Sequence, residues 1–161
     1  MRELEEKMRF FLIANLAALL FLPVARAQEA MPGAISDAYE STLSALQSAK
    51  SPADIHRMME AMDSPDWVSV APTGEKTSRD DAENQLKGLL SIPPGQRPIP
   101  IQKTIFVSDQ GSRVLVLYWV YRVTDQGKIG SIVRDSWLKT SDGWRRTMHE
   151  KLIPDRLLSL P

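Results

Sequence analysis

The last third of the chain is the feature that most limits what it can fold into. Residues 112–124 are rich in β-branched and aromatic side chains, a Gly-containing turn follows at 127–130, and a second such run covers 134–150. These residue types favour strands, and the Asp-Gly pair at 142–143 favours a tight hairpin turn. The segment therefore predicts three long antiparallel strands, a sheet whose apolar face other elements must cover.

The residues before this segment predict helices and two further strands. Apolar side chains recur with helical spacing in three stretches, and Ser51 and Ser78 each begin a helix-capping sequence. We expect a turn from Asp63 to Asp66 to end the second helix. The predicted helices cover residues 34–50, 51–62 and 78–91, and the predicted strands cover 67–70 and 101–108.

The first 27 residues have the organisation of a secretory signal peptide. Cations precede an apolar run at 10–24, and an A-x-A site ends at Ala27. Three glutamates before Met8 dilute the leading positive charge, so Met8 is an alternative start. We expect cleavage between Ala27 and Gln28, which places the protein in the periplasm or outside the cell. The alternative is a permanent membrane anchor, but the run is shorter than the ~20 residues that span a bilayer, so we expect no stable membrane insertion after cleavage.

The remainder reads as one domain, with a disordered leader at 28–32 and a folded region at 33–161. The chain has a formal net charge of zero and no cysteine. This composition excludes disulfide bonds and offers no basic stripe for nucleic acid. His56 and His149 have no metal-ligand spacing between them or with carboxylates, so we expect neither a metal nor a cofactor.

The strand at 113–123 is apolar on both of its faces. A strand with one face in water alternates apolar and polar residues, and this one does not. The helices can cover only one face. We therefore expect a homodimer that forms through the outer face of the sheet.

The final strand carries charge among its apolar residues. Arg146 and Glu150 share a face with Trp144 and Met148, and buried charges are costly unless they are paired. We expect Arg146 and Glu150 to pair with each other or to line a wet cavity. The alternate face, which includes His149, is predicted to face solvent. Asp135 is expected to form a surface pair with a lysine, and its alternative role is to supply a second carboxylate to the site.

Several short motifs occur together in a recognisable order. They are the helix start Asp54-Ile55, the strand and turn from Asp66 to Gly74, the helix entry from Ser78 to Ala82, and the hairpin from Asp135 to Arg145. In this order and spacing, residues from about 33 to 155 resemble the nuclear transport factor 2-like superfamily. The hairpin resembles that of the SnoaL-like and ketosteroid-isomerase-like branch of this superfamily. Uncharacterised secreted proteins of bacterial type belong to this branch.

The resemblance implies an α+β fold, in which a cone-shaped, curved antiparallel sheet wraps around two to three N-terminal helices. It also implies a pocket at the open end of the cone. Members include isomerases, dehydratases and cyclases that act on small apolar molecules, and others have no catalysis. By position, the expected pocket residues are Trp67, Tyr118, Arg146, Met148 and Glu150.

The catalytic positions of the family are poorly matched. In the ketosteroid-isomerase-like branch a carboxylate just before the P-x-G turn is the general base, and here that residue is Ala71, next to Pro72. The nearest candidate for the family's phenolic acid is Tyr39. This departure favours a protein that is not an enzyme.

Three functions remain open from the sequence. The first is an exported protein that binds a small, largely apolar molecule in the cone. The second is an isomerase, dehydratase or cyclase that uses Glu150 or Asp66 as base and a tyrosine as acid. The third is a non-catalytic structural dimer with a filled cone. The contents of the cone decide between them.

Overall fold

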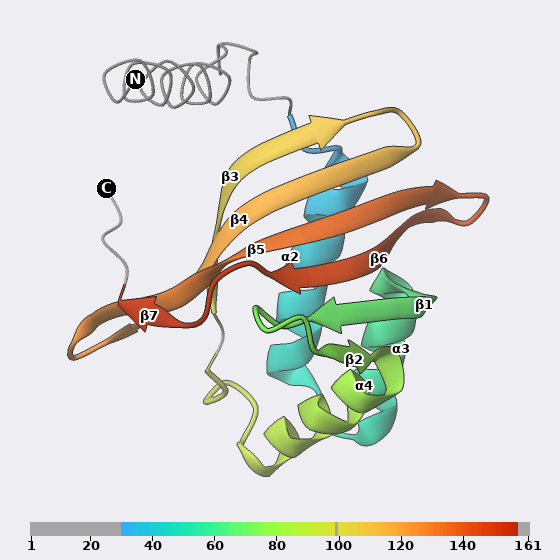
Figure 1. Ribbon diagram of the computed structural model, residues 1–161. Coiled ribbons are helices and arrows are strands. Elements are labelled where there is room, and N and C mark those ends of the chain that lie inside the picture. The colour runs from blue at the N-terminus through green and yellow to red at the C-terminus, as the bar shows by residue number, and fades with distance from the viewer. Residues whose placement is uncertain (1–29, 99, 158–161) are drawn as a thin grey trace, which may run out of the picture.

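The computed structural model describes residues 30–98 and 100–157 (Figure 1). The predicted signal peptide and its cleavage site lie outside the described residues. Within the described part of the chain, no helix is long and apolar enough to cross a membrane.

Local capping sequences set where two of the three helices begin. Helix α2 spans Gly33–Ser48 and α3 spans Pro52–Met62. Ser51 caps α3 in a reciprocal capping box with Asp54, and a proline occupies its first turn. Ser78 accepts a hydrogen bond from the Asp81 backbone at the start of α4, Arg79–Lys87, which runs into the 3-10 helix η1, Gly88–Ser91. The predicted helix starts are confirmed, and the third helix changes its winding near its end.

The strands form one mixed sheet. Their bounds are β1 Asp63–Val70, β2 Lys76–Ser78, β3 Ile101–Asp109, β4 Arg113–Thr124, β5 Gly127–Thr140, β6 Gly143–Lys151 and β7 Arg156–Leu157. The order across the sheet is β2-β1-β6-β5-β4-β3, with β7 paired to β5. β1 runs parallel to β6, and the other pairs are antiparallel. The three predicted long strands are confirmed as β4, β5 and β6.

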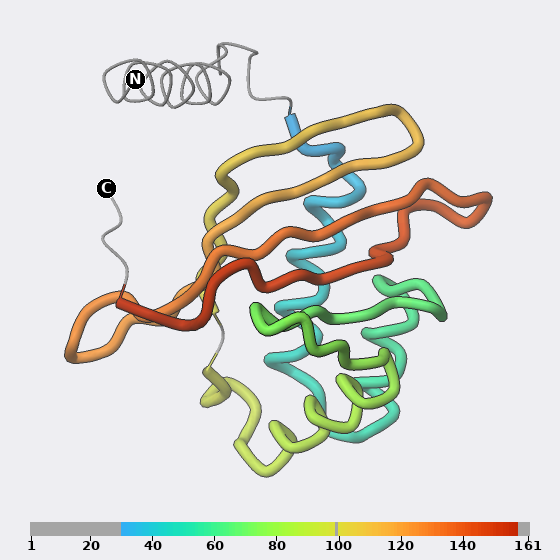
Figure 2. The backbone as a smooth tube through the Cα atoms, viewed as in Figure 1, coloured from blue at the N-terminus to red at the C-terminus, as the bar shows by residue number. Residues whose placement is uncertain are grey.

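The sheet is curved and unclosed, and the helices lie along its concave side (Figures 1 and 2). The strands β3 to β6 pass over α2, while β1 and β2 lie beside α3 and α4. This arrangement confirms the expected α+β architecture, in which a cone-like sheet wraps around three helices.

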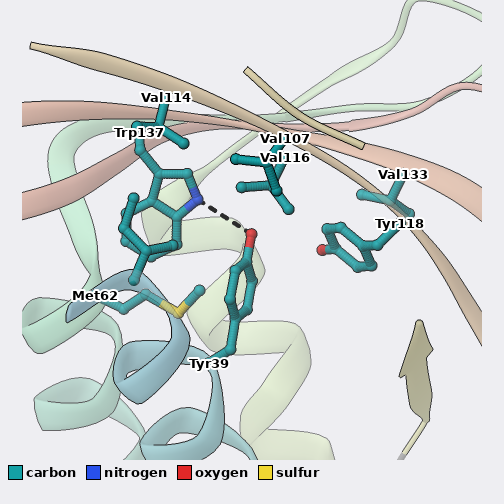
Figure 3. Close-up of a cluster of buried hydrophobic side chains, with 9 residues drawn as sticks. Tyr39, Met62, Val107, Val114, Val116, Tyr118, Val133 and Trp137 are labelled. Atoms are coloured by element: carbon teal, nitrogen blue, oxygen red, sulfur yellow. Dashed lines mark hydrogen bonds between the residues drawn. The ribbon is translucent and has the colours of Figure 1, made fainter. Parts of the chain in front are cut away.

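The core lies between α2 and the inner face of the long strands (Figure 3). Ile35 and Tyr39 project from α2 onto Val114, Val116 and other fully buried side chains of the sheet. Period-two alternation explains why Val114, Val116 and Tyr118 are buried together. Met31, which lies in the predicted leader at 28–32, packs against this core.

The predicted turn from Asp63 to Asp66 is wrong. These residues begin β1, and Asp63 is paired with Arg146 of β6 before the register shifts ahead of Val68. Asp63 is 2% exposed. The proline and aspartates that suggested a turn lie instead at the irregular start of a strand, where proline is tolerated.

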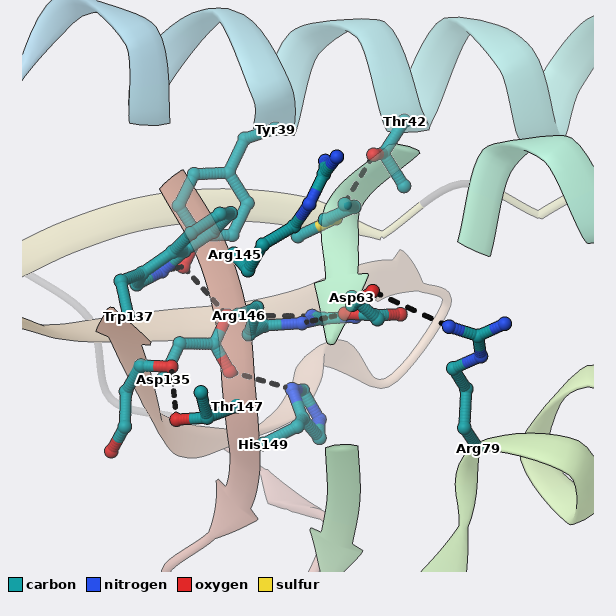
Figure 4. A network of polar contacts seen from close by, with 12 residues as sticks. Tyr39, Thr42, Asp63, Arg79, Asp135, Trp137, Arg145, Arg146, Thr147 and His149 are labelled. Atoms are coloured by element: carbon teal, nitrogen blue, oxygen red, sulfur yellow. Dashed lines mark hydrogen bonds and ion pairs between the residues drawn. The ribbon is translucent and has the colours of Figure 1, made fainter. Parts of the chain in front are cut away.

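β6 contains an irregularity of its own. Arg146 pairs with Trp137 of β5, yet Met148 pairs with Ser136, so Thr147 is an extra residue in the ladder. A β-bulge of this kind shifts the side-chain alternation of the strand by one residue. Arg146 and His149 consequently point to the same side of the sheet (Figure 4).

The outer face of the sheet keeps apolar side chains near solvent. Leu115 and Leu117 of β4 are only partly buried, and Phe106 beside Leu117 is 46% exposed. Ile101, opposite Tyr121, is also 46% exposed. The helices thus leave this face uncovered, as the strand pattern predicted.

Candidate functional site

Asp135 is the centre of a buried polar network (Figure 4). Its side chain is fully buried on β5. One carboxylate oxygen, Oδ2, accepts hydrogen bonds from the hydroxyls of Tyr39 at 2.6 Å and Tyr118 at 3.0 Å. The other, Oδ1, lies 2.9 Å from Nδ1 of His149. The expectation of a surface pair between Asp135 and a lysine is wrong, because the strand places this residue on the inner face.

Arg146 joins Asp135 to a second buried carboxylate. Its guanidinium donates to Asp63 through Nε at 2.7 Å and Nη2 at 3.2 Å, and its Nη1 lies 3.4 Å from Asp135 Oδ2. A paired, two-pronged contact of this kind matches guanidinium to carboxylate geometry. Trp67 packs on the guanidinium, with 5.2 Å between Cζ and the ring centroid. Arg146 therefore bridges β6 to β1 and β5 from within the cone.

The aromatic residues complete this network from the core side. Trp137 Nε1 donates to the Tyr39 hydroxyl at 3.1 Å (Figure 3), and both Tyr118 and Trp137 meet the Tyr39 ring edge-on. Tyr39 thus accepts one hydrogen bond from Trp137 and donates one to Asp135. These side chains fill the depth of the cone, and their polar atoms form hydrogen bonds within the network.

The local charges fix the protonation of the network. Burial by itself would raise the pKa of Asp135, but Arg146 and the hydrogen bonds from His149 and Tyr39 lower it to about 2. Burial raises the pKa of Asp63 even though Arg146 opposes the shift. Burial and the Asp135 charge raise the pKa values of both Tyr39 and Tyr118 well above their ordinary value. The tyrosines are therefore neutral donors, and Asp135 is an ionised acceptor.

The ionised Asp135 also determines the tautomer of His149. A carboxylate can only accept hydrogen bonds, so His149 Nδ1 must carry the proton that it shares with Asp135. In the neutral ring Nε2 is then an acceptor. The prediction that His149 faces solvent is wrong, because the bulge at Thr147 turns it inward, where its side chain is 29% exposed.

Glu150 takes no part in the network. It is paired with Arg134 of β5, directly opposite on the outer face, and not with Arg146. The expected Arg146–Glu150 pair is therefore wrong, for the same reason: the bulge places these two residues on opposite faces. Asp66 is exposed at the start of β1. Of the three catalytic candidates from the sequence, only Tyr39 lies within the network.

A hollow of about 410 Å³ opens beside the network, between α3, α4 and the strands β1 and β6. We call it the Trp67 pocket. Its apolar wall includes Met59 and Leu86, and its polar side carries Arg146 and His149 together with Trp67. The Trp67 ring is 5% exposed, and its Nε1 has no hydrogen-bond partner among the described residues. Tyr118, Met148 and Glu150, the other expected pocket residues, do not line this hollow.

Two other possibilities carry less chemistry. A hollow of about 620 Å³ lies between α2 and α3 and is lined mainly by small residues away from His149. Across residues 30–98 and 100–157, no group of three or more His, Cys, Asp or Glu side chains is placed to hold a metal ion. In the Trp67 pocket, by contrast, apolar walls and convergent polar groups coincide.

The sequence identified Arg146 as a candidate residue, but it did not identify the residues that pair with it. Asp63 was assigned to a turn, Asp135 to a surface pair and His149 to the solvent face, the last because the alternation of the final strand was read without the bulge. The one available signal was the Arg146 charge in an apolar strand, which required a buried partner. It did not show which of the acidic residues would supply it.

No protein-family model matches the chain, and no curated protein matches it significantly. Solved structures match its fold. A nuclear transport factor 2-like protein of unknown function from Silicibacter pomeroyi is 16% identical, with a TM-score of 0.53, over 77% of this chain and 94% of that one. Another from Pseudomonas aeruginosa is 14% identical, with a TM-score of 0.52, over 73% and 92%.

A protein from Parabacteroides distasonis, provisionally named a ketosteroid isomerase, is 14% identical, with a TM-score of 0.50, over 78% of this chain and 89% of that one. Identities this low establish shared architecture and leave activity to the site itself. The element order, the curved sheet and these likenesses show that the chain has the fold of the nuclear transport factor 2-like superfamily, as its motifs predicted.

Proposed function

We propose that this protein binds a small, mainly apolar molecule in the Trp67 pocket. The observation that carries the proposal is a hollow with apolar walls lined by Trp67, whose buried Nε1 lacks a partner among the described residues. A buried donor without an acceptor is destabilising, by about 1–3 kcal/mol, and a bound ligand with an acceptor group would remove that penalty. The volume of about 410 Å³ falls within the ~300–1,000 Å³ of small-molecule sites.

The charges around the pocket favour a neutral ligand. Arg146 already faces two carboxylates, Asp63 and Asp135, so its charge needs no anionic ligand. Trp67 Nε1 can only donate, and the Nε2 atom of His149 offers an acceptor when the ring carries its proton on the Nδ1 that faces Asp135. A molecule with a carbonyl or ether oxygen for Trp67 and a hydroxyl for His149 fits both groups.

Export belongs to the same proposal. The signal-peptide features of residues 1–27 support a mature protein that begins at Gln28 and acts in the periplasm or outside the cell. The protein would then meet its ligand outside the cytoplasm. Detection of a chain with Gln28 at its N-terminus in the exported fraction is the expected result, and an uncleaved chain held in the membrane would contradict it.

A thermal-shift screen of neutral apolar compounds tests the binding proposal, with the protein lacking residues 1–27. Trp67→Phe is the informative variant, because it removes the N–H and keeps most of the ring. We expect it to weaken binding of ligands that carry an acceptor while leaving the unliganded protein folded. Equal binding by wild type and Trp67→Phe would contradict the assigned site.

A second candidate function is acid–base catalysis. The observation that favours it is the His149–Asp135 pair beside the pocket, which leaves Nε2 as a possible base. In this alternative His149 replaces Glu150 or Asp66 as the base, and Ala71 still stands where the family carries a carboxylate. If a turnover is found, loss of at least ~100-fold in kcat for His149→Gln, with substrate affinity retained, would support it, whereas unchanged kcat would exclude it.

Dimer formation through the outer face is a separate part of the proposal, and it holds whether or not the protein binds a ligand. The exposed Phe106 and Ile101 beside partly buried leucines support it, because apolar patches on a sheet mark contact surfaces. Sedimentation at micromolar concentration is expected to show a dimer, and Phe106→Lys is expected to convert it to a monomer. A wild-type monomer would contradict this part, together with the alternative of a purely structural dimer.

A further inference from the structure

A second hollow, of about 300 Å³, lies on the other side of His149. We call it the Ser131 pocket. Its walls come from the loop before β3 and from the long strands, and include Pro98, Val120, Ser131 and Val133. His149 lines this hollow as well as the Trp67 pocket. The two hollows therefore meet at a single imidazole.

The floor of the Ser131 pocket contains a second polar group without a partner. Ser131 is fully buried, and its Oγ has no hydrogen-bond partner among the described residues. It follows the alternation of β5, which buries Val133 and Asp135 on the same inner face. An unpaired hydroxyl in such a position is destabilising. Ser131 and Trp67, which line the two hollows, thus each carry one unpaired buried polar atom.

The backbone next to Ser131 is held rigidly. A Cβ at Gly130 would lie 2.0 Å from the carbonyl oxygen of Val120 and 2.6 Å from Cα of Tyr121. Only glycine permits β4 and β5 to approach this closely. The close approach fixes the register of β5 beside Ser131, and so it fixes the floor of the pocket.

Hydrogen bonds within the protein also hold the opposite wall of the Ser131 pocket, which is the loop before β3. Arg97 is 5% exposed, and its guanidinium donates to the backbone carbonyls of Leu89 at 3.0 Å, Ile92 at 3.1 Å and Leu46 at 2.8 Å. These carbonyls lie at or just beyond the ends of η1 and α2, where helices leave acceptors unpaired. Arg97 thus anchors the loop that presents Pro98 to the pocket.

The rim of the Ser131 pocket favours a neutral group. Lys151 is paired with Asp155 at 2.9 Å, and the remaining cation at the rim, Arg122, is exposed and so screened by solvent. A serine hydroxyl both donates and accepts. It is therefore suited to a ligand hydroxyl or carbonyl.

We infer that the ligand is elongated, passes His149, and carries a neutral polar group at its far end that hydrogen-bonds to Ser131. The inference rests on the proposed function, because it extends the ligand of the Trp67 pocket into the Ser131 pocket. Ser131 is then the residue that selects ligands by length and by their second polar group.

Calorimetry on the purified protein with two matched probes tests the inference. The probes are n-decanol, with one terminal hydroxyl, and n-decanediol, with a hydroxyl at each end. We expect wild type to bind the diol about fivefold more tightly, the size of one net hydrogen bond. Ser131→Ala should abolish this preference and leave the affinity for n-decanol unchanged, while Ser136→Ala, on the outer face of the same strand, should retain the preference.

The outcomes separate the two proposals. Binding of both probes with no preference for the diol, or with a preference that survives in Ser131→Ala, would overturn the role of Ser131 and leave the Trp67 pocket standing. Binding that is insensitive to both Trp67→Phe and Ser131→Ala would overturn both.

A measurement without ligand tests Ser131 even if neither probe binds. Removal of an unpaired hydroxyl should raise the melting temperature of the free protein. We therefore expect a higher melting temperature for Ser131→Ala than for wild type. A lower one would show that the hydroxyl is already satisfied within the protein and would overturn the inference.

Discussion

Strands β5 and β6 carry two sets of opposite charges, one on each face of the sheet. On the inner face Arg146 and His149 meet Asp135, which is fully buried, while on the outer face Arg134 meets Glu150, with side chains that are 43% and 24% exposed. The two sets are made by adjacent residues of the same hairpin. The two sets differ in burial. The inner charged groups are removed from water and are stabilised by one another, whereas the outer pair remains partly hydrated.

Because of this difference in burial, the inner and outer ion pairs contribute differently to the stability of the fold. A buried ion pair need not stabilise a fold relative to an apolar core, but the removal of one partner is severe because the other is left uncompensated. An exposed pair contributes little, because solvent screens it. The inner set therefore holds β1, β5 and β6 in one arrangement around His149, and the outer pair does not position the site.

The largest expected effect comes from removing Arg146. Arg146→Met leaves Asp63 and Asp135 buried without their common cation, and we expect the free energy of unfolding to fall by about 3–5 kcal/mol. Urea denaturation measures it. Adding Asp63→Asn should recover part of the loss, because it removes one of the two stranded charges. A loss as small as that expected for the outer pair would show that the inner network is not buried as described.

The second largest effect is expected from acid, which should lower the stability contributed by the inner charged residues. The folded pKa of Asp135 is about 2, below the unfolded value of about 3.9. A depressed pKa contributes stability that is present above the unfolded pKa and is lost as pH falls toward the folded one, here on the order of 2 kcal/mol between about pH 5 and pH 2. The raised pKa of Asp63 has the opposite sign and offsets part of this loss.

The difference between wild type and Asp135→Asn isolates the contribution of Asp135, when unfolding is followed by urea denaturation at several pH values. The variant should be less stable than wild type at neutral pH, and the gap should narrow as pH falls toward 2. A gap that stays constant with pH would contradict the depressed pKa.

Tyr39 should have a smaller effect. Tyr39→Phe removes the hydroxyl between Trp137 Nε1 and Asp135, and we expect a loss of about 1–2 kcal/mol because both partners stay buried. Thermal unfolding measures the loss. Tyr121→Phe, on the outer face of β4, is the matched control and should change the stability by less than half as much.

The outer pair should give the smallest effect. Glu150→Gln removes the charge opposite Arg134, and we expect less than about 0.5 kcal/mol, smaller still at high salt. The same variant tests the catalytic candidate from the sequence, because any turnover should survive it. A fall of more than ~2 kcal/mol in the free energy of unfolding would show that the outer ion pair contributes as much as the inner network, and would contradict the difference described above.

The candidate site was predicted less well than the fold. Arg146 was recognised as a candidate from its charge in an apolar strand, Tyr39 and Trp67 were recognised from their positions in the family resemblance, and the motifs predicted the architecture. Asp63 was assigned to a turn because it precedes Ser-Pro, and His149 to solvent because strict alternation was assumed. Both errors come from irregular strands, whose extra residue leaves no clear mark in a single sequence.

The sequence alone determined the elements that depend on neighbours in the chain. Ser51 and Ser78 set their helix starts through contacts three residues away, and the Asp-Gly pair set the β5–β6 hairpin. Only the tertiary structure decided the site, because Arg146 meets Asp63 across 83 positions and Tyr39 meets Asp135 across 96. Which carboxylate neutralises which cation depends on how β1 packs beside β6 and where β6 bulges, and these are properties of the assembled sheet.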